Sequence, residues 1–271
     1  MALAQHLSIE IRYRQQVDNT REFLLPFLSR SIPLHKGMKV MEIGCGEGGV
    51  LLPFIEQGMQ VLGVDLNESR IRNATSLCAE AVAQGQATFL YKNVFDQDFL
   101  VKYGGSFDLI LLKDTIEHIP DQETFIPYLR KFLTKGGSIF FGFPPWRMPF
   151  GGHQQICRNK VLGTLPWYHL LPKGLYKGIV KMAGEPQIVV DELMDIKGTG
   201  ISLGRFERII RKNDFVVKDR MLFLLNPIYK FKFGWKPIEQ AAWLADFPWV
   251  RDFFTTAGWY VVGEKNAESA T

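Results

Sequence analysis

The stretch VMEIGCGEGG, residues 40–49, decides the fold because a short apolar run leads directly into a cluster of glycines. Glycines let the backbone turn sharply and approach a ligand with no Cβ in the way. The start of a helix after such a loop supplies free backbone N–H groups. We therefore predict a strand at Lys39–Ile43, a ligand-binding glycine loop, and a helix at Gly49–Glu56.

Strands and helices alternate on either side of this loop. Apolar positions at helical spacing predict a leading helix within residues 8–30. Phe107–Leu112 reads FDLILL, which is typical of a strand buried on both faces. This alternation predicts an α/β fold with a doubly wound parallel sheet. The further expected strands are Gln60–Val64, Ala87–Tyr91 and Ser138–Phe143, and the further expected helices are Glu68–Ala83 and Asp121–Thr134.

The alternation ends at Pro144-Pro145. Residues 145–200 mix Gly, Pro, aromatic residues and Lys, so we expect an inserted lid there, without an obvious core of its own. A helix at Ser202–Lys212 and strands at Val216–Leu225 and Gly258–Gly263 are expected after it, with an irregular aromatic segment between the two strands. The chain thus divides into a helical cap (1–34), a ligand-binding half (35–144), an inserted lid (145–200) and a C-terminal half (201–271).

Composition bounds the class of protein. The chain of 271 residues is 46% hydrophobic and 22% charged, which is the balance of a soluble globular protein. We find no apolar run of the length that crosses a membrane, and the start lacks the apolar core of a secretory signal. Cys45, Cys78 and Cys157 have no C-x-x-C spacing, so we expect neither a disulfide frame nor a zinc site, and we expect a cytoplasmic location.

Basic residues gather in and before the insertion. Residues 124–184 contain nine Lys and Arg and no Asp or Glu, although the net charge of the whole chain is only +4. Lys173, Lys177 and Lys181 would share one face of a helix. Such a face suits peripheral contact of the 145–182 stretch with an anionic membrane, attraction of an anionic substrate, or simple solvation of a lid helix. Without a recognisable binding module, we do not expect nucleic acid as a partner.

A carboxylate, Asp65, ends the second strand. It can accept hydrogen bonds from both hydroxyls of a ribose, and with the glycine loop this is the general α/β arrangement for a nucleoside-containing cofactor. Gly44, Gly46 and Gly49 satisfy the dinucleotide pattern G-x-G-x-x-G. Glu42, however, places a charge two residues before the first glycine. An acid there suits a cationic ligand, such as the sulfonium of S-adenosylmethionine, better than a pyrophosphate.

Three further motifs follow in order, namely DTIEHIPD (114–121), LTKGGSI (133–139) and GWYVVGEK (258–265). Together with the glycine loop and Asp65, they resemble the class I S-adenosylmethionine-dependent methyltransferases of the small-molecule, methyltransferase type 11-like kind. The resemblance covers residues 35–145, and residues 202–225 and 257–265 more loosely. It implies a seven-stranded sheet of order 3-2-1-4-5-7-6, with the last strand antiparallel and helices on both faces.

The resemblance also implies the residues of the cofactor site. Asp65 would hold the ribose and Leu66 the adenine, and Lys113 lies where the backbone approaches the cofactor. The family usually shows an acid and then an apolar residue after the third strand. Asn93-Val94 stands there instead, so the Asn93 amide, or Asp96, would meet the adenine amino group. The residues implied around the methionine end are Glu42, Gly44, Cys45, Gly46 and Gly48.

Methyl transfer requires a nucleophile aligned with the S–CH3 bond, exclusion of water and removal of a proton. His118 is the first candidate for the base, because the pKa of an imidazole lies near neutrality. The alternative is an orienting role, which the Glu-His pair often has in this family. His153, among the glycines of the insertion, is the second candidate, or else a solvated loop residue. Trp146, Trp167 and Tyr168 offer an aromatic wall for the acceptor.

Two observations narrow the class further. Pro144-Pro145-Trp146 lacks the leading Asn or Asp of amino-directed methyltransferases. Asp114 has no second acid or Asn after the fifth strand, so we expect no metal site. We expect an S-adenosylmethionine-dependent methyltransferase acting on a small apolar, lipid-like or anionic acceptor, with the methylated atom left open. An NAD(P)-dependent oxidoreductase and a cofactor-binding member without catalysis remain the alternatives.

Overall fold

The glycine loop follows the first strand of a largely parallel sheet. The computed structural model describes residues 9–265. Its sheet has eight strands in the order β3-β2-β1-β4-β5-β8-β6-β7, of which β8 runs antiparallel to β5. The predicted order 3-2-1-4-5-7-6 is confirmed, and the two-residue β7 is an additional edge strand. The strands are β1 (Lys39–Ile43), β2 (Gln60–Asp65), β3 (Ala87–Tyr91), β4 (Phe107–Lys113), β5 (Leu133–Phe143), β6 (Phe215–Leu225), β7 (Ile238–Glu239) and β8 (Ala257–Glu264).

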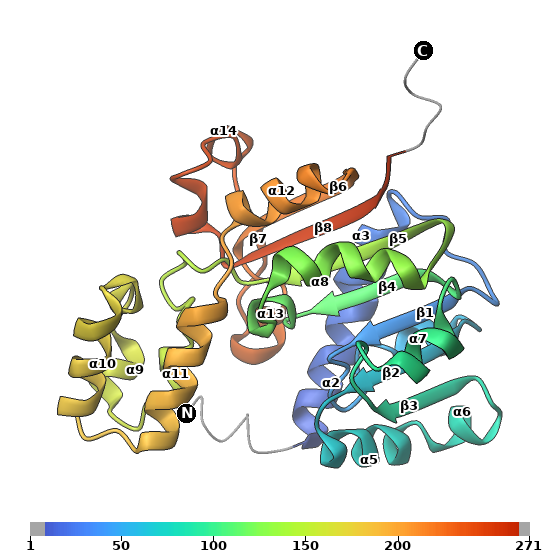
Figure 1. The fold of residues 1–271 in the computed structure, drawn as a ribbon, viewed down its shortest axis with the longest axis horizontal. Coiled ribbons are helices and arrows are strands. Elements are labelled where there is room, and N and C mark those ends of the chain that lie inside the picture. Colours follow the sequence, from blue (N-terminus) through green and yellow to red (C-terminus); the bar gives the residue numbers. More distant parts are fainter. Residues whose placement is uncertain (1–8, 266–271) are drawn as a thin grey trace.

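Helices cover both faces of the sheet (Figure 1). The α-helices of the described residues, of which α9, α10 and α11 belong to the insertion and not to these faces, are α2 (Ile9–Asn19), α3 (Leu25–Ser29), α4 (Leu52–Glu56), α5 (Glu68–Leu77), α6 (Ala79–Ala83), α7 (Gln97–Tyr103), α8 (Gln122–Tyr128), α9 (Lys160–Thr164), α10 (Lys173–Met182), α11 (Gln187–Thr199), α12 (Leu203–Lys212), α13 (Ile228–Phe233) and α14 (Ala242–Ala245). Along β4, Ile110 and Leu112 belong to the core that includes α8 and α12. Leu109 and Leu111 belong to the other core, with α3, α4 and α5. The apolar run of β4 is therefore buried on both faces, as predicted.

Several predicted helices differ in their bounds. The helix expected at Asp121–Thr134 consists of α8 followed by a short 3-10 helix, Leu129–Phe132. It ends at Phe132 because Leu133 already pairs with Phe107 in the sheet. The expected helix at Glu68–Ala83 is divided at Cys78 into α5 and α6. The leading helix runs from α2 through a π-helical turn, Thr20–Leu24, into α3. The sequence analysis missed α7, which has one buried apolar residue, Phe99.

The insertion is helical and has a core of its own, so the expectation of a segment without a fixed core is wrong. Tyr176 and Val180 of α10 face Val190 and Leu193 of α11, and all four are buried in one cluster. Spacing of three and four residues places such pairs on one helix face. The ends of the insertion lie side by side, because Trp146 N donates to Ile201 O at 2.8 Å. In Figure 1, α9, α10 and α11 stand apart from the sheet, opposite the arrowheads of β1 and β4.

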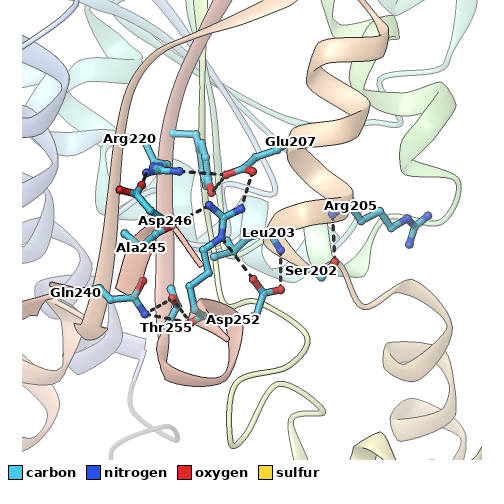
Figure 2. A network of polar contacts seen from close by, with 12 residues as sticks. Ser202, Leu203, Arg205, Glu207, Arg220, Gln240, Ala245, Asp246, Asp252 and Thr255 are labelled. Atoms are coloured by element: carbon cyan, nitrogen blue, oxygen red, sulfur yellow. Dashed lines mark hydrogen bonds and ion pairs between the residues drawn. The ribbon is translucent and has the colours of Figure 1, made fainter. Parts of the chain in front are cut away.

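The segment between β6 and β8 contains α13, β7 and α14, whereas the sequence indicated irregular structure. Its buried Arg251 donates to Glu207 of α12 at 2.6 Å and to Ala245 O at 3.1 Å. Tyr260 of β8 donates to the same carboxylate at 2.9 Å. Figure 2 shows this network, which ties the segment to α12 and β8. None of the helices within residues 9–265 is both long and apolar enough to cross a membrane.

Candidate functional site

The loop between β1 and α4 holds three glycines in the left-handed region, with φ of +76° at Gly44, +53° at Gly46 and +80° at Gly48. A Cβ at Gly44 would lie 2.5 Å from Thr115 Oγ1, and one at Gly48 would lie 2.9 Å from Phe89 Cε1. A Cβ at Gly46 would meet no heavy atom of the described part of the chain within 4 Å. Gly44 and Gly48 therefore permit close packing of the loop, whereas Gly46 faces open space.

Asp65, at the end of β2, organises this loop. Its Oδ2 accepts a hydrogen bond from Gly46 N at 2.9 Å, and its Oδ1 accepts one from Asn67 N at 2.8 Å. A carboxylate has about four acceptor positions, so two bonds leave capacity for a ligand hydroxyl. The sequence predicted Asp65 as a ribose ligand but missed that it also fixes the glycine loop.

Glu42 is a buried acid beneath the loop, with only 2% of its surface exposed. Its Oε2 has no hydrogen-bond partner among the described residues. Burial raises the pKa of Glu42 well above its usual range, and the nearby Asp65 and Asp114 add to this effect while Lys113 opposes it. A buried carboxyl oxygen without a partner is costly, so this position favours a ligand that brings a donor or a positive charge.

The other predicted cofactor residues lie at the same end of the sheet. Leu66 is exposed directly after β2, and Val94 is buried within the turn that follows β3. The Asn93 amide oxygen accepts from Phe95 N at 3.0 Å, so this side chain shapes the turn. The Cys45 side chain is buried, and burial raises the pKa of its thiol well above its usual range. Cys45 can therefore offer a cofactor its backbone rather than its thiol.

Beyond β4, the chain turns sharply at Asp114, whose φ is +52°. Lys113 Nζ forms an ion pair with Asp114 Oδ2 at 2.8 Å. On α13, burial raises the pKa of Tyr229 and lowers that of Lys232. The charge of Asp114 acts on both groups as a smaller effect that favours a higher pKa, so α13 lies close to this turn. The sequence analysis missed α13 at this site, because nothing in local spacing connects it to the glycine loop.

The structure brings His118 and His153 together. His118 ends the 3-10 helix η2 (Ile116–His118), and His153 comes from the insertion with φ of +53°. Their ring centroids lie 5.0 Å apart. Burial lowers the pKa of both imidazoles, to about 4 for His153, so both are neutral at pH 7. Both predicted base candidates therefore lie on one side of the turn after β4.

The insertion is attached to that turn. Thr199 Oγ1 at the end of α11 donates to Glu117 O at 2.6 Å, and Gln122 Nε2 donates to Thr199 O at 2.5 Å. Between His118 and α11 lies a cleft of about 340 Å³. Its walls combine two apolar side chains, three acidic ones, a histidine and a threonine, namely Ile188, Ile196, Asp191, Glu192, Asp195, His118 and Thr199.

The three predicted acceptor aromatics lie outside this lining. Trp146 packs edge-on against His169, with ring centroids 4.6 Å apart. Trp167 is 39% exposed and donates its indole N–H to Arg147 O at 3.2 Å. Tyr168 is only 6% exposed and packs against Tyr176 in the core of the insertion. The interpretation of Tyr168 as acceptor surface is therefore corrected, because its ring is enclosed by its own segment.

Comparisons with known proteins agree with this geometry. A family model described as a methyltransferase domain matches residues 12–169. The ubiquinone biosynthesis O-methyltransferase of Acinetobacter baylyi is 29% identical over 140 residues, which are 52% of this chain and 55% of that protein. The chain thus spans about half the length of the curated relatives it matches.

Solved structures share the fold. Magnesium protoporphyrin IX methyltransferase from Synechocystis PCC 6803, with bound S-adenosylhomocysteine, has a TM-score of 0.53 at 15% identity over 96% of this chain and 89% of that chain. The cyclase SpnF has a TM-score of 0.54 at 13% identity over 90% of this chain and 81% of that chain. The family model covers more than half of the 271 residues. The chain therefore belongs to the class I S-adenosylmethionine-dependent methyltransferase family.

Proposed function

We propose that this protein transfers a methyl group from S-adenosylmethionine to a small-molecule acceptor. The observation that carries the proposal is Glu42, a buried carboxyl whose Oε2 has no partner within residues 9–265, beneath a loop whose Gly46 faces open space. A sulfonium or ammonium near this acid would stabilise its ionised form. A pyrophosphate would bring no positive charge to Glu42 and would meet the negative charges of Asp65 and Asp114, which disfavours the NAD(P) alternative.

The cofactor would lie across the carboxyl ends of β1, β2 and β4, as ligands do in open α/β sheets. Asp65 would hold the ribose, and Leu66 with Asn93 and Val94 would contact the adenine. Lys113 would contribute its backbone beside the cofactor. The methionine end would lie along the glycine loop, at Glu42, Gly44, Cys45, Gly46 and Gly48. The neighbour that carries bound S-adenosylhomocysteine supports this choice of cofactor.

The acceptor would enter between His118 and α11. The cleft there has the volume of a small-molecule site, and Ile188 and Ile196 offer it apolar surface. Asp191 and Asp195 line the same wall, so the cleft favours a neutral or cationic acceptor over the anionic one that the sequence allowed. His118 or His153 would accept the proton that the nucleophile loses, because both imidazoles are neutral at pH 7.

A peripheral membrane contact is a separate part of the proposal. α10 carries Lys173, Lys177 and Lys181, and its Met182 is 90% exposed. Lysines beside an exposed apolar side chain suit an anionic lipid surface. Sedimentation with vesicles containing phosphatidylserine tests this contact. The triple variant with Gln at the three lysines should lose binding, and equal binding by variant and wild type would rule out α10 as the contact.

Turnover tests the methyl-transfer proposal. The protein is incubated with S-adenosylmethionine and a panel of phenols, alcohols and amines of about the cleft's size, and S-adenosylhomocysteine release is followed. We expect release that depends on one acceptor class. Cofactor binding without release by any member of the panel would favour the alternative of a cofactor-binding member without catalysis.

A further inference from the structure

We propose that Glu117, His118 and His153 form a binding site for a divalent transition-metal ion of the Zn²⁺ class. One ligand atom from each residue lies within 4.8 Å of the others. His118 Nε2 and Glu117 Oε1 lie 4.0 Å apart. Metal–ligand bonds of about 2.1 Å require ligand atoms about 4 Å apart or less. Small rotations of the two imidazoles would therefore complete the site.

The carboxyl of Glu117 points to a missing partner. The residue is only 4% exposed, and neither Oε1 nor Oε2 has a hydrogen-bond partner among residues 9–265. A buried carboxyl in this state is destabilising unless a cation or a donor satisfies it. Its backbone is held firmly, because Glu117 O accepts the hydrogen bond from Thr199 Oγ1. The acid is thus fixed in place without any visible structural use for its side chain.

The backbone at His153 adds a second, independent indication. A non-glycine residue at φ of +53° is strained, and such strain is found most often at functional sites. The neighbouring Gly152 allows this placement, since a Cβ there would lie 2.4 Å from His169 Cβ. The strain places the imidazole of His153 beside that of His118, where neutral rings can ligate a metal.

The donor set selects the class of ion. Two imidazole nitrogens and one carboxylate suit Zn²⁺, Fe²⁺, Mn²⁺ or Co²⁺, whereas Mg²⁺ and Ca²⁺ prefer oxygen ligands alone. Negative charge nearby favours any of these cations, because Asp114 acts electrostatically on Glu117, His118 and His153. No second acid or Asn follows the fifth strand in the sequence, so a metal site was not expected there; a histidine of the insertion completes this donor set instead.

The site has a use that rests on the proposed function. His118 lines the cleft, so coordination positions left open by three protein ligands would face the acceptor. With both imidazoles bound to the ion, neither would serve as the base; the ion would instead lower the pKa of an acceptor hydroxyl, whose proton would leave to solvent. The oxygen would then form a bond to the methyl carbon as the carbon–sulfur bond breaks and its electron pair returns to sulfur. The acceptor class is accordingly a phenol or another hydroxyl compound.

Zn²⁺ titration of tag-free, metal-stripped protein tests the site without using turnover. We expect one tight Zn²⁺ per chain and a loss of affinity of at least about tenfold in Glu117→Gln, His118→Gln and His153→Asn. Asn is chosen at His153 because it tolerates the left-handed backbone. His35→Gln, at an exposed histidine far from the site in sequence, is the matched control and should bind Zn²⁺ like the wild type.

Circular dichroism establishes which variants are folded. Folded variants of all three ligands that bind Zn²⁺ as tightly as the wild type, or a wild type that binds none, would overturn the metal site. S-adenosylhomocysteine affinity, measured in parallel, should be the same with and without Zn²⁺. Zn²⁺ binding without S-adenosylhomocysteine binding would support the metal site and refute the proposed function. Failure of the metal site can thus be distinguished from failure of the proposed function. Metal-dependent turnover of phenols but not amines would support the hydroxyl class, and the reverse would refute it.

Discussion

At the scale of single residues, Asp65 connects the loop to the ligand it is proposed to hold. Its two oxygens accept from Gly46 N and Asn67 N. Asp65→Ala should weaken S-adenosylhomocysteine binding by about 1.5–3 kcal/mol, the range for hydrogen bonds to charged groups. Calorimetry measures this change, with the exposed Asp98→Ala as the control. Unchanged affinity in a folded Asp65→Ala protein would refute the ribose assignment.

Gly46 and Gly48 provide a matched pair. Gly46→Ala would place a methyl group in open space and should reduce cofactor affinity by steric exclusion, at a stability cost of only about 1 kcal/mol, from the backbone strain at φ of +53° that Gly48→Ala shares at +80°. Gly48→Ala would place the same group 2.9 Å from Phe89 and should cost roughly 1–3 kcal/mol of stability through overpacking. Thermal melts and calorimetry of both variants test the contrast. Equal loss of melting temperature in both variants would contradict the distinction between a ligand-facing and a packing glycine.

At the scale of elements, the insertion depends on a buried neutral histidine. His169 Nε2 lies 2.8 Å from Trp146 O, to which it donates, and Gln154 Nε2 lies 3.4 Å from Nδ1. Burial lowers the pKa of His169 to about 4, against 6.5 when unfolded. The unfolded chain therefore binds more protons between these values, and stability falls as pH drops from 6.5 towards 4, by about 3 kcal/mol in total.

Urea unfolding at pH 7 and pH 5 tests this dependence. His169→Gln keeps a polar side chain but does not titrate, so it should lose less stability between these pH values than the wild type. Between pH 7 and pH 5, the wild type should lose about 2 kcal/mol more of its free energy of unfolding than His169→Gln. An identical pH dependence in the two proteins would show that His169 does not contribute to acid destabilisation.

Two aromatic residues that are adjacent in sequence, Trp167 and Tyr168, differ in how deeply they are buried in the insertion. Tyr168 is enclosed with Tyr176, so Tyr168→Ala should destabilise the protein by roughly 3–5 kcal/mol through cavity formation. Trp167 is partly exposed, and Trp167→Ala should cost less than half as much. Chemical denaturation compares the two variants. A larger loss for Trp167→Ala would contradict the packing described here.

Local patterns predicted the parallel half of the sheet well, because each strand there carries its own signal, whereas α7, with one buried apolar residue, does not. β4 is an apolar run, and the glycine loop marks the end of β1. The insertion was harder, since its helices are recognisable only once α10 and α11 pack on each other. The burial of Tyr168 follows from that packing, which no short stretch of sequence reveals.

At the scale of the whole molecule, the site combines segments that are distant in sequence. The glycine loop and Asp65 come from neighbouring strands, so their proximity could be predicted from strand order. His153 reaches His118 only because the insertion returns to the turn after β4, where Thr199 bonds to Glu117. α13 reaches α2 in the same way, through Gln15 Nε2 donating to Phe231 O at 3.2 Å. Such contacts depend on the finished fold.

Isothermal titration calorimetry with S-adenosylmethionine, S-adenosylhomocysteine and NAD⁺ tests the central claim most directly. The claim is that a buried acid and an open glycine loop at the end of β1 bind a sulfonium nucleoside. We expect both sulfur nucleosides to bind and NAD⁺ to show no heat of binding. Glu42→Gln should weaken the cationic S-adenosylmethionine more than the neutral S-adenosylhomocysteine. Binding of NAD⁺ in place of the sulfur nucleosides would contradict the account.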